Sequence, residues 1–210
     1  MARIRAEPGR RARRAATVVA MTDRQLSAGL PDDAFLTDGL LTKRVLRAYA
    51  LAVLAPRPGE LLWDLGAGTG SIGLEWCRLH PANSAIAVER DAERAARITA
   101  NAANFEVSAR LQVLVDDLSS AIDGLPTPAA VFFGGGIDDQ LLQQCWQVLV
   151  VGGRLVAHSV TAESDGALLA AHTRWGGDLT RIAVETAEPI GHFTGFTPAR
   201  TVTAWSAVKA

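Results

Sequence analysis

The sequence predicts an α/β fold in which helices cover both faces of a doubly wound, mostly parallel sheet. From Leu61 to Trp175, short apolar runs alternate with helical patterns, which is typical of right-handed crossovers between parallel strands. A glycine-rich turn, GAGTG, follows the first apolar run. After Trp175 the alternation stops and two β-like runs complete the pattern. The length of 210 residues suits one domain with a substantial core.

The first predicted helix lies at residues 41–54, LTKRVLRAYALAVL, where apolar residues recur at helical spacing. Thr42 is its expected cap, and Pro56 lies just beyond its end. A buried strand, LLWDL, is predicted at 61–65. Further strands are expected at 84–89, 110–115, 129–133 and 154–160, and further helices at 71–79, 91–105, 140–149 and 167–175.

The last two β-like runs, at 180–190 and 201–208, are joined by a segment without a helical pattern. Two strands connected by a loop pair antiparallel far more readily than parallel. The predicted sheet therefore has seven strands and ends in an antiparallel hairpin at one edge.

The charge balance argues against a nucleic-acid partner. Lys and Arg number 21 against 22 Asp and Glu, so the large basic excess of phosphate-binding chains is missing. The basic residues of the N-terminus predict a disordered tail at 1–25, and its apolar run AATVVAM is too short for a signal peptide or a membrane span. Residues 26–210 form the predicted domain.

The two cysteines, Cys77 and Cys145, lie in separate segments without metal-ligand spacing. Neither a disulfide framework nor a metal site is expected. We predict buried free thiols in a cytoplasmic protein.

The turn at Gly66, Gly68 and Gly70 predicts a ligand site, because glycines let the backbone turn tightly and approach a ligand closely. In such sheets, ligands bind outside the carboxyl ends of the strands, where the strand order reverses. A tight turn without a ligand is the alternative. The pattern GxGxG fits outright, whereas the dinucleotide fingerprint GxGxxG is met only imperfectly, with Ser71 third.

Charge favours S-adenosylmethionine over a dinucleotide. Asp64 precedes the turn, Glu75 lies in the following helix, and no basic residue occurs from Leu61 to Trp76. A pyrophosphate would find little positive charge there. A carboxylate such as Asp64 would stabilise the sulfonium and ammonium groups of S-adenosylmethionine.

Two further acidic positions extend this prediction. Glu89 ends the second strand, from which a carboxylate can accept hydrogen bonds from both ribose hydroxyls. Asp117 could receive the adenine amino group, with Leu118 against the ring. The alternatives are an exposed carboxylate beside Arg90 for Glu89, and a helix cap for Asp117.

These motifs give the chain a likeness to the class I S-adenosylmethionine-dependent methyltransferases. From about Pro31 to Lys209 it resembles the decarboxylating precorrin C15-methyltransferases of cobalamin biosynthesis. These occur as a separate subunit or as the C-terminal half of precorrin-6Y C5,15-methyltransferases. The resemblance rests on PDDAF from Pro31, LTKRVLRA from Leu41, LLWDLGAGTGSIGLEW from Leu61, AVERD from Ala87, AVFFGGG from Ala130, GGRLVAHSVTAES from Gly152 and GHFTGFTP from Gly191.

The resemblance implies methyl transfer to C15 of a late precorrin, of the precorrin-6B/7 type, with loss of CO2 from the C12 acetate. It also implies a homo-oligomer, a tetramer, and pairing with a C5-methyltransferase, whose own half is absent here. The implied cofactor contacts are Thr42, Gly66, Ala67, Gly68, Thr69, Gly70, Glu89, Asp117 and Leu118. The chain departs from the family at three places: Asp116 to Ser119 where Gly-Asp-Ala-Pro is usual, His158 where Asn is usual, and Phe196 where Trp is usual.

For the chemistry, His158 and Glu163 are the acid–base groups nearest the expected pocket. A core imidazole and a helix-start carboxylate are the respective alternatives. Gly134, Gly135 and Gly136 would leave room for a flat substrate, unless they form a plain loop. The basic residues that could bind substrate carboxylates are Lys43, Arg154, Arg181 and Arg200.

Three other functions are weighed against this one. An RNA or DNA base methyltransferase of the same fold is disfavoured because FFGGG replaces the Asn/Asp-Pro-Pro-Tyr type of motif. An NAD-dependent oxidoreductase would need the third small residue of its fingerprint. A non-catalytic binding module has no positive sign in the sequence.

Overall fold

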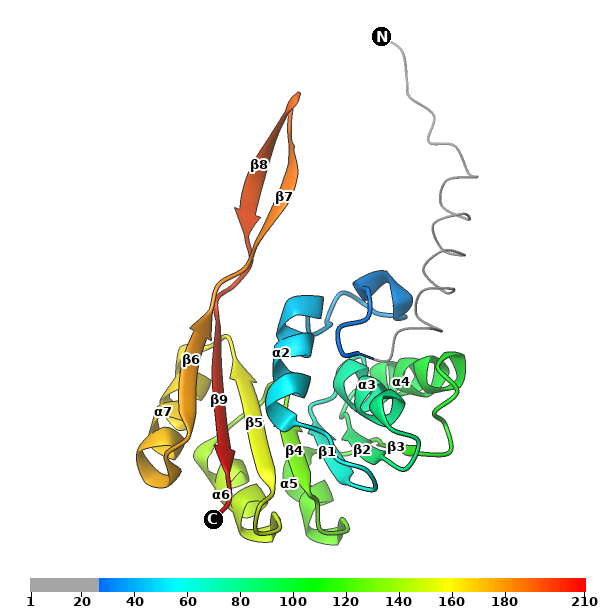
Figure 1. Cartoon of the computed structure of the whole chain (residues 1–210), viewed down its shortest axis with the longest axis vertical. Coiled ribbons are helices and arrows are strands. Elements are labelled where there is room, and N and C mark those ends of the chain that lie inside the picture. Colours follow the sequence, from blue (N-terminus) through cyan, green and yellow to red (C-terminus); the bar gives the residue numbers. More distant parts are fainter. Residues whose placement is uncertain (1–26) are drawn as a thin grey trace.

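A computed structural model describes residues 27–210, and the tail predicted at 1–25 lies outside this range. Its main sheet has seven strands in the order β3-β2-β1-β4-β5-β9-β6 (Figure 1). The first five are parallel, as predicted. The strands are β1 (Leu61–Leu65), β2 (Ser84–Val88), β3 (Leu111–Leu114), β4 (Ala130–Phe133), β5 (Arg154–Ser159), β6 (Asp178–Ile182), β7 (Glu185–Ile190), β8 (Phe193–Pro198) and β9 (Val202–Val208).

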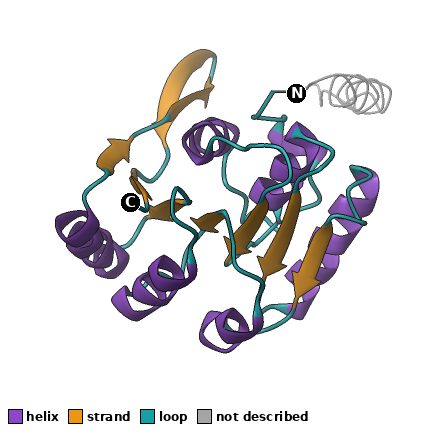
Figure 2. Cartoon of the chain, turned by 60° about the horizontal axis from the view of Figure 1, so that its bottom comes forward, coloured by secondary structure: helices purple, strands orange, loops and turns teal. Residues whose placement is uncertain are grey.

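Helices cover both faces of the sheet (Figure 2). Their bounds are η1 (Asp32–Ala34), α2 (Arg44–Leu54), α3 (Ser71–Leu79), α4 (Ala92–Asn104), α5 (Leu118–Ala121), η2 (Ile122–Gly124), α6 (Asp139–Val148) and α7 (Ala162–Trp175). One core contains α2, α3 and α4, with Leu62 of β1 facing it, and the other contains α6 and α7, with Trp63 facing it. Neighbouring residues of a strand thus pack into opposite cores, because successive side chains point to opposite faces of the sheet.

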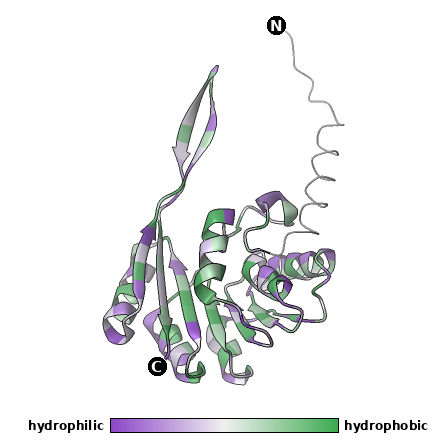
Figure 3. Cartoon of the chain, viewed as in Figure 1, coloured by the Kyte–Doolittle hydropathy of each residue, from purple (hydrophilic) through white to green (hydrophobic). Residues whose placement is uncertain are grey.

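Strand order reverses between β1 and β4: β1 pairs in parallel register with β2 on one side and with β4 on the other. The carboxyl ends of β1, β2, β4 and β5 therefore meet at one edge of the sheet. Hydrophobic residues are frequent in the body of the molecule, and α2 contains many of them (Figure 3). Among the described helices, none is long and apolar enough to cross a membrane.

The C-terminal part confirms the antiparallel pairing but differs in detail. β9 lies between β5 and β6 and is antiparallel to both. The run predicted as one strand at 180–190 is divided between β6 and β7, and the expected loop at 191–200 contains β8. β7 and β8 pair with each other as a separate two-stranded sheet, which we call the arm (residues 185–198), and it projects from the body (Figure 1).

The N-terminal caps of three helices add to or correct the predictions. Thr42 does not cap α2, because Lys43 occupies the N-cap position and makes no side-chain cap bond. α7 begins five residues earlier than expected, where the Thr161 side chain accepts a hydrogen bond from the Ser164 N–H. Asp91 caps α4 by accepting from the N–H groups of Glu93 and Arg94. Both helices therefore gain a side-chain acceptor for their free amides.

The two cysteines are buried free thiols, as predicted. Burial raises the pKa of Cys77 and of Cys145 to about 12, so both thiols are protonated at neutral pH.

Candidate active site

A cavity of about 710 Å³ opens at the carboxyl ends of β1, β2, β4 and β5, where the strand order reverses. This is where ligands bind in doubly wound sheets, and the volume lies in the ordinary range for ligand pockets. The predicted site residues that line it are Thr42, Asp64, Gly66, Ala67, Gly68, Glu89, Asp117, Leu118, Gly134, Gly135, Gly136 and His158. Thr69, Gly70 and Glu163 are not among the lining residues.

The glycine turn joins β1 to α3 in a conformation that side chains disfavour. Gly66, Gly68 and Gly70 have φ values of 67°, 59° and 72°, in the left-handed region. A Cβ on Gly66 would lie 3.1 Å from the Gly135 carbonyl oxygen, and one on Gly134 would lie 2.9 Å from the Gly66 carbonyl oxygen. The turn and the loop after β4 therefore pack backbone against backbone, and both face the cavity.

Gly70 and Thr69 support the turn from behind the cavity. A Cβ on Gly70 would lie 2.6 Å from Cγ2 of Ile98, so this glycine allows close packing on α4. The Thr69 hydroxyl donates to the Leu40 carbonyl at 2.5 Å. These two predicted contacts thus act through the position of the turn.

Asp64 lies in the floor of the site, with 1% of its surface exposed. One carboxyl oxygen accepts a hydrogen bond from the Gly73 N–H at 2.9 Å. Burial, with the nearby Glu89 carboxylate adding to it, raises the pKa of Asp64 to about 7. The group is therefore ready to ionise when a cation approaches.

Glu89 holds the turn in place. Its carboxylate accepts from the Gly68 N–H at 2.8 Å and from the Asp91 N–H at 3.0 Å. With 5% of its surface exposed, it is a buried group, so the alternative of an exposed carboxylate beside Arg90 is wrong.

Asp117 and Leu118 line the cavity from the segment after β3. Asp117 occupies the N-cap position of the short helix α5, but its side chain makes no cap hydrogen bond. The capping alternative is therefore not met, and the carboxylate is available to the cavity.

His158, on β5, is 6% exposed and lines the cavity. Its ring stands edge-on to Phe132, with centroids 5.2 Å apart, and lies 6.2 Å from the Tyr49 ring. Its Nε2 has no hydrogen-bond partner among the described residues. Burial lowers the pKa of His158 to about 4, so the imidazole is neutral at pH 7. Glu163, by contrast, is exposed in the first turn of α7.

Of the four basic residues predicted as candidates to bind substrate carboxylates, one lines the cavity and three do not. Lys43 lines the cavity. Arg154 does not: it is buried at the opposite end of β5, where it pairs with Glu60 and donates to the Leu54 carbonyl. Arg181 is exposed and paired with Asp165, and Arg200 is exposed next to the arm.

Glu75 corrects the charge argument of the sequence. It is buried and accepts from the N–H groups of Gly29 and Leu30, and from Arg47, whose side chain is fully buried. Glu75 therefore holds the segment before α2 in place and is not one of the acidic residues that line the cavity. An isolated Glu in a helix gives no sequence signal for such a role, because Arg47 lies 28 residues away.

Sequence reasoning missed a group of uncharged polar residues that line the cavity beside His158. They are Gln140, Gln144, Ser159, Thr161 and Ser164. Their positions after β4 and β5, at the carboxyl edge of the sheet, were the available signal.

Comparison with known proteins agrees with this geometry. A family model for the precorrin methyltransferase domain matches residues 33–209. A precorrin-6Y C(5,15)-methyltransferase [decarboxylating] from Sinorhizobium sp is 48% identical over 88% of this chain and 45% of its own length. The chain thus spans about half the length of the curated relatives it matches.

Two solved structures are similar in fold. The C-terminal domain of precorrin-6Y C5,15-methyltransferase from Rhodobacter capsulatus is 40% identical with a TM-score of 0.84, covering 88% of this chain and 100% of that one. An S-adenosylmethionine-dependent O-methyltransferase from Thermotoga maritima, 17% identical, shares only the fold, with a TM-score of 0.64 over 91% of this chain and 71% of that one. The fold is that of the class I methyltransferases, and the chain belongs to the precorrin methyltransferase domain family.

Proposed function

We propose that this chain is an S-adenosylmethionine-dependent methyltransferase that methylates C15 of a late precorrin, of the precorrin-6B/7 type, and decarboxylates its C12 acetate in cobalamin biosynthesis. The observation that carries the proposal is the cavity with two buried carboxyl groups, Asp64 and Glu89, beside an open glycine turn. Relatives named as decarboxylating precorrin methyltransferases support the substrate and reaction. The names of these relatives give no support to the base-methyltransferase alternative.

The residues present fit the proposed cofactor. The left-handed Gly66 and Gly68 leave backbone exposed to the cavity without a Cβ, and the carboxyl groups supply negative charge for a cation. When bound, S-adenosylmethionine supplies an electrophilic methyl group. The residues proposed to hold it are Thr42, Asp64, Gly66, Ala67, Gly68, Glu89, Asp117 and Leu118.

The chain's own contribution to methyl transfer is position. A meso carbon in a conjugated tetrapyrrole is enamine-like, so it needs alignment more than a strong base. We propose that Gly134, Gly135 and Gly136 lie against the flat substrate. A Cβ on Gly135 or Gly136 would meet no atom within 4 Å, which leaves that side of the cavity open.

Decarboxylation leaves an electron pair that the macrocycle can accept, and a proton must then reach carbon. Of the two predicted acid–base groups, His158 lines the cavity and is proposed to bind the substrate as a neutral hydrogen-bonding group. Glu163 stays a prediction, and its exposed position does not support a role in proton transfer.

The test is mass spectrometry of a late precorrin incubated with the protein and S-adenosylmethionine. The expected product gains one CH2 and loses one CO2. Gly66→Val, which places a branched side chain against the Gly135 carbonyl, is expected to abolish the product. An unchanged precorrin with the wild-type protein, or methylation of tRNA in a parallel reaction, contradicts the proposal.

We further propose a homo-oligomer, a tetramer, that pairs with a C5-methyltransferase. The arm supports an assembly, because Ile190, Phe193 and Phe196 are 64%, 80% and 70% exposed on it. A two-stranded hairpin without a core is at best marginally stable alone. The match to a C-terminal domain supports the pairing with a C5-methylating partner.

A further inference from the structure

The cavity has two chemically different halves. The carboxyl groups of Asp64, Glu89, Asp116 and Asp117 come from the ends of β1, β2 and β3. The other half is lined by residues in or next to α2, α6 and β5, which are uncharged polar side chains and the exposed Lys43. Asp138 lies there too, but its carboxylate is engaged by the Leu141 N–H at 2.8 Å as the cap of α6.

The basic residues that line the cavity are Lys43, Arg90 and Arg94. Arg94 is paired with Asp38, and Arg90 follows β2 on the acidic side. Lys43 has no ion-pair partner among residues 27–210 and immediately precedes α2, which packs against β4 and β5. Lys43 is therefore the basic residue that can bind an anion in the half of the cavity next to α2, α6 and β5.

The N-terminus of α2 adds to this positive charge. The helix has 11 residues, no side-chain cap and no acidic residue in its first turn. Thr42, Lys43 and Leu46, on either side of its first amides, all line the cavity. Uncapped amides at a helix start, with the partial charge of the dipole, favour an anion.

His158 points independently to a ligand in the same half. It is more than nine-tenths buried, lines the cavity and lies beside Tyr49 of α2, yet its Nε2 has no partner in the described chain. The buried Oε1 of Gln144, another lining residue, is also without a partner. Buried polar atoms nearly always find a partner, so a bound molecule with polar groups is expected here.

We propose that Lys43 and the open first turn of α2 bind a carboxylate side chain of the tetrapyrrole substrate, with His158 hydrogen-bonding the same molecule. This anchor rests on the proposed function and assigns the substrate to the half of the cavity opposite the acidic wall. A polycarboxylate would be repelled by that wall, which leaves the α2 side for its acidic groups.

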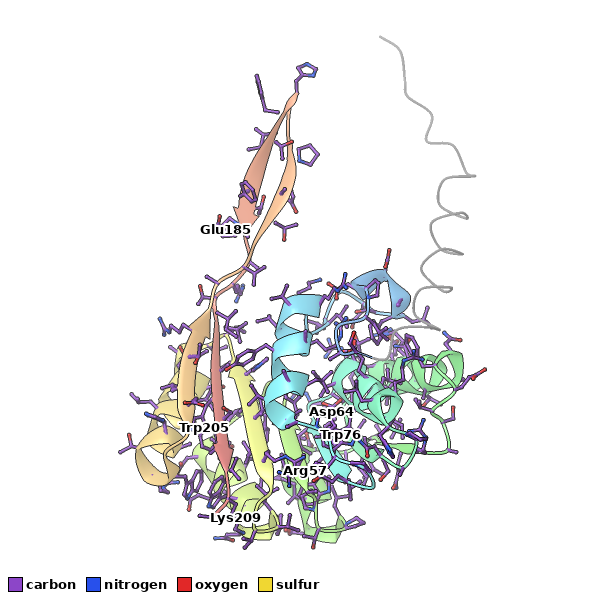
Figure 4. The ribbon with its side chains drawn as sticks, in the orientation of Figure 1. Arg57, Asp64, Trp76, Glu185, Trp205 and Lys209 are labelled. Carbon is purple, nitrogen blue, oxygen red and sulfur yellow. The ribbon has the colours of Figure 1, made fainter. Side chains whose placement is uncertain are left out.

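The test compares Lys43→Gln, Lys43→Arg and Arg57→Gln in the full chain. Arg57 is an exposed cation near the opposite end of the sheet, which makes it a matched control (Figure 4). Fluorescence titration with uroporphyrin, a tetrapyrrole with carboxylate side chains, measures binding without turnover. Calorimetry with S-adenosylmethionine measures the cofactor separately.

Lys43→Gln is expected to weaken uroporphyrin binding about tenfold, the loss of one hydrogen bond to a charged group. Lys43→Arg should restore most of the affinity, and Arg57→Gln should leave it unchanged. The affinity for S-adenosylmethionine should stay within about twofold in all three variants. In turnover, Lys43→Gln should raise KM for the precorrin more than it lowers kcat.

Three results would overturn the proposed anchor. The wild-type protein does not bind uroporphyrin, Lys43→Gln binds uroporphyrin with wild-type affinity, or Lys43→Gln loses affinity for S-adenosylmethionine and not for uroporphyrin. The last result would assign Lys43 to the carboxylate of the cofactor. Because the titration needs no turnover, failure of C15 methylation leaves it informative. Conversely, an active enzyme in which Lys43→Gln changes neither KM nor uroporphyrin binding rejects the anchor alone.

Discussion

Asp64 shows how a single buried carboxyl group can make cofactor binding depend on pH. Its pKa is raised to about 7, so the folded apo protein favours the protonated form. The stability that this group contributes is present below its unfolded pKa and is lost as pH rises through about 7. A bound cation has the opposite preference, because it favours the carboxylate.

We therefore predict that the affinity for S-adenosylmethionine rises between pH 6 and pH 8 by a factor of about five to ten, following ionisation of Asp64. Asp64→Asn should bind more weakly and lose this slope, while the exposed Asp123→Asn should keep it. Calorimetry at several pH values measures this. A slope that survives in Asp64→Asn would show that another group titrates.

His158 has the reverse relation between pH and stability. Burial lowers its pKa to about 4 from an ordinary value near 6.5, so the unfolded chain binds a proton first as the solution is acidified. The protein should lose up to about 3 kcal/mol of stability as pH falls from 6.5 through 4. His158→Asn should remove this component, and His192→Asn, on the exposed arm, should not. Urea unfolding at pH 7 and pH 4.5 measures the difference, and equal acid sensitivity of the His158→Asn protein would refute it.

At the level of residues, the sequence predicted where the cavity lies better than it predicted what each charged residue does. The glycine turn and Glu89 could be placed because β1, β2 and their turns are local patterns with one geometry. Arg154 and Glu75 were misplaced because their partners, Glu60 and Arg47, are distant in sequence. In the sequence, a charged residue whose ion-pair partner is distant cannot be distinguished from one that contacts a ligand.

Among the elements, α2 is connected to the chain before it by a network centred on Arg47, which pairs with Asp32 and donates to the Leu30 carbonyl. Arg47 is fully buried against Glu75, and Glu75 also accepts the amides of Gly29 and Leu30. Since residues 40–43 line the cavity, this network positions one wall of the site.

We predict that Glu75→Gln costs about 3 kcal/mol, because it leaves the Arg47 guanidinium buried with only the part-exposed Asp32 carboxylate as a counter-charge. Hydrogen exchange should rise in residues 28–36, and cofactor affinity should fall with it. Arg174→Gln, which breaks the half-exposed pair with Asp139, should change stability by less than about 1 kcal/mol. A Glu75→Gln protein as stable as the Arg174→Gln protein would contradict the role of the network.

The elements were predicted well where they pack and poorly where they do not. The parallel strands and their helices have apolar periods set by the core, and β1 and α3 agree with the sequence to the residue. The arm has no core to impose a period: every residue of β7 is exposed, and all of β8 except one. Gly191, Gly195 and Pro198 therefore resembled a loop, whereas β7 was predicted as part of the strand at 180–190.

For the whole molecule, the arm is the feature that a monomer does not explain. It extends beyond the body at Glu185, while Trp205 on the connected strand β9 is fully buried (Figure 4). Exposed phenylalanines on a projecting hairpin favour contact with another protein surface.

We predict that replacing residues 183–201 with an Asn-Gly turn yields a folded monomer in place of an oligomer. Ile182 pairs with Val202 in antiparallel register, so a two-residue turn can close β6 onto β9. Light scattering after size exclusion measures the mass, and circular dichroism checks the fold. Thr186→Ser, a mild change on the arm, should leave the assembly intact. An assembly that persists without the arm, or a monomeric wild-type protein, would contradict the prediction.

The place of β9 in the sheet also has a consequence for synthesis. β5 and β6 both pair with β9, which follows them in the chain. On the ribosome, β5 is made well before β9, so its free edge can leave the exit tunnel before its antiparallel partner exists. The half of the sheet that contains β5 and β6 can therefore close only once β9 has been made, and a nascent chain stalled before Val202 would present the open edge of β5 to chaperones.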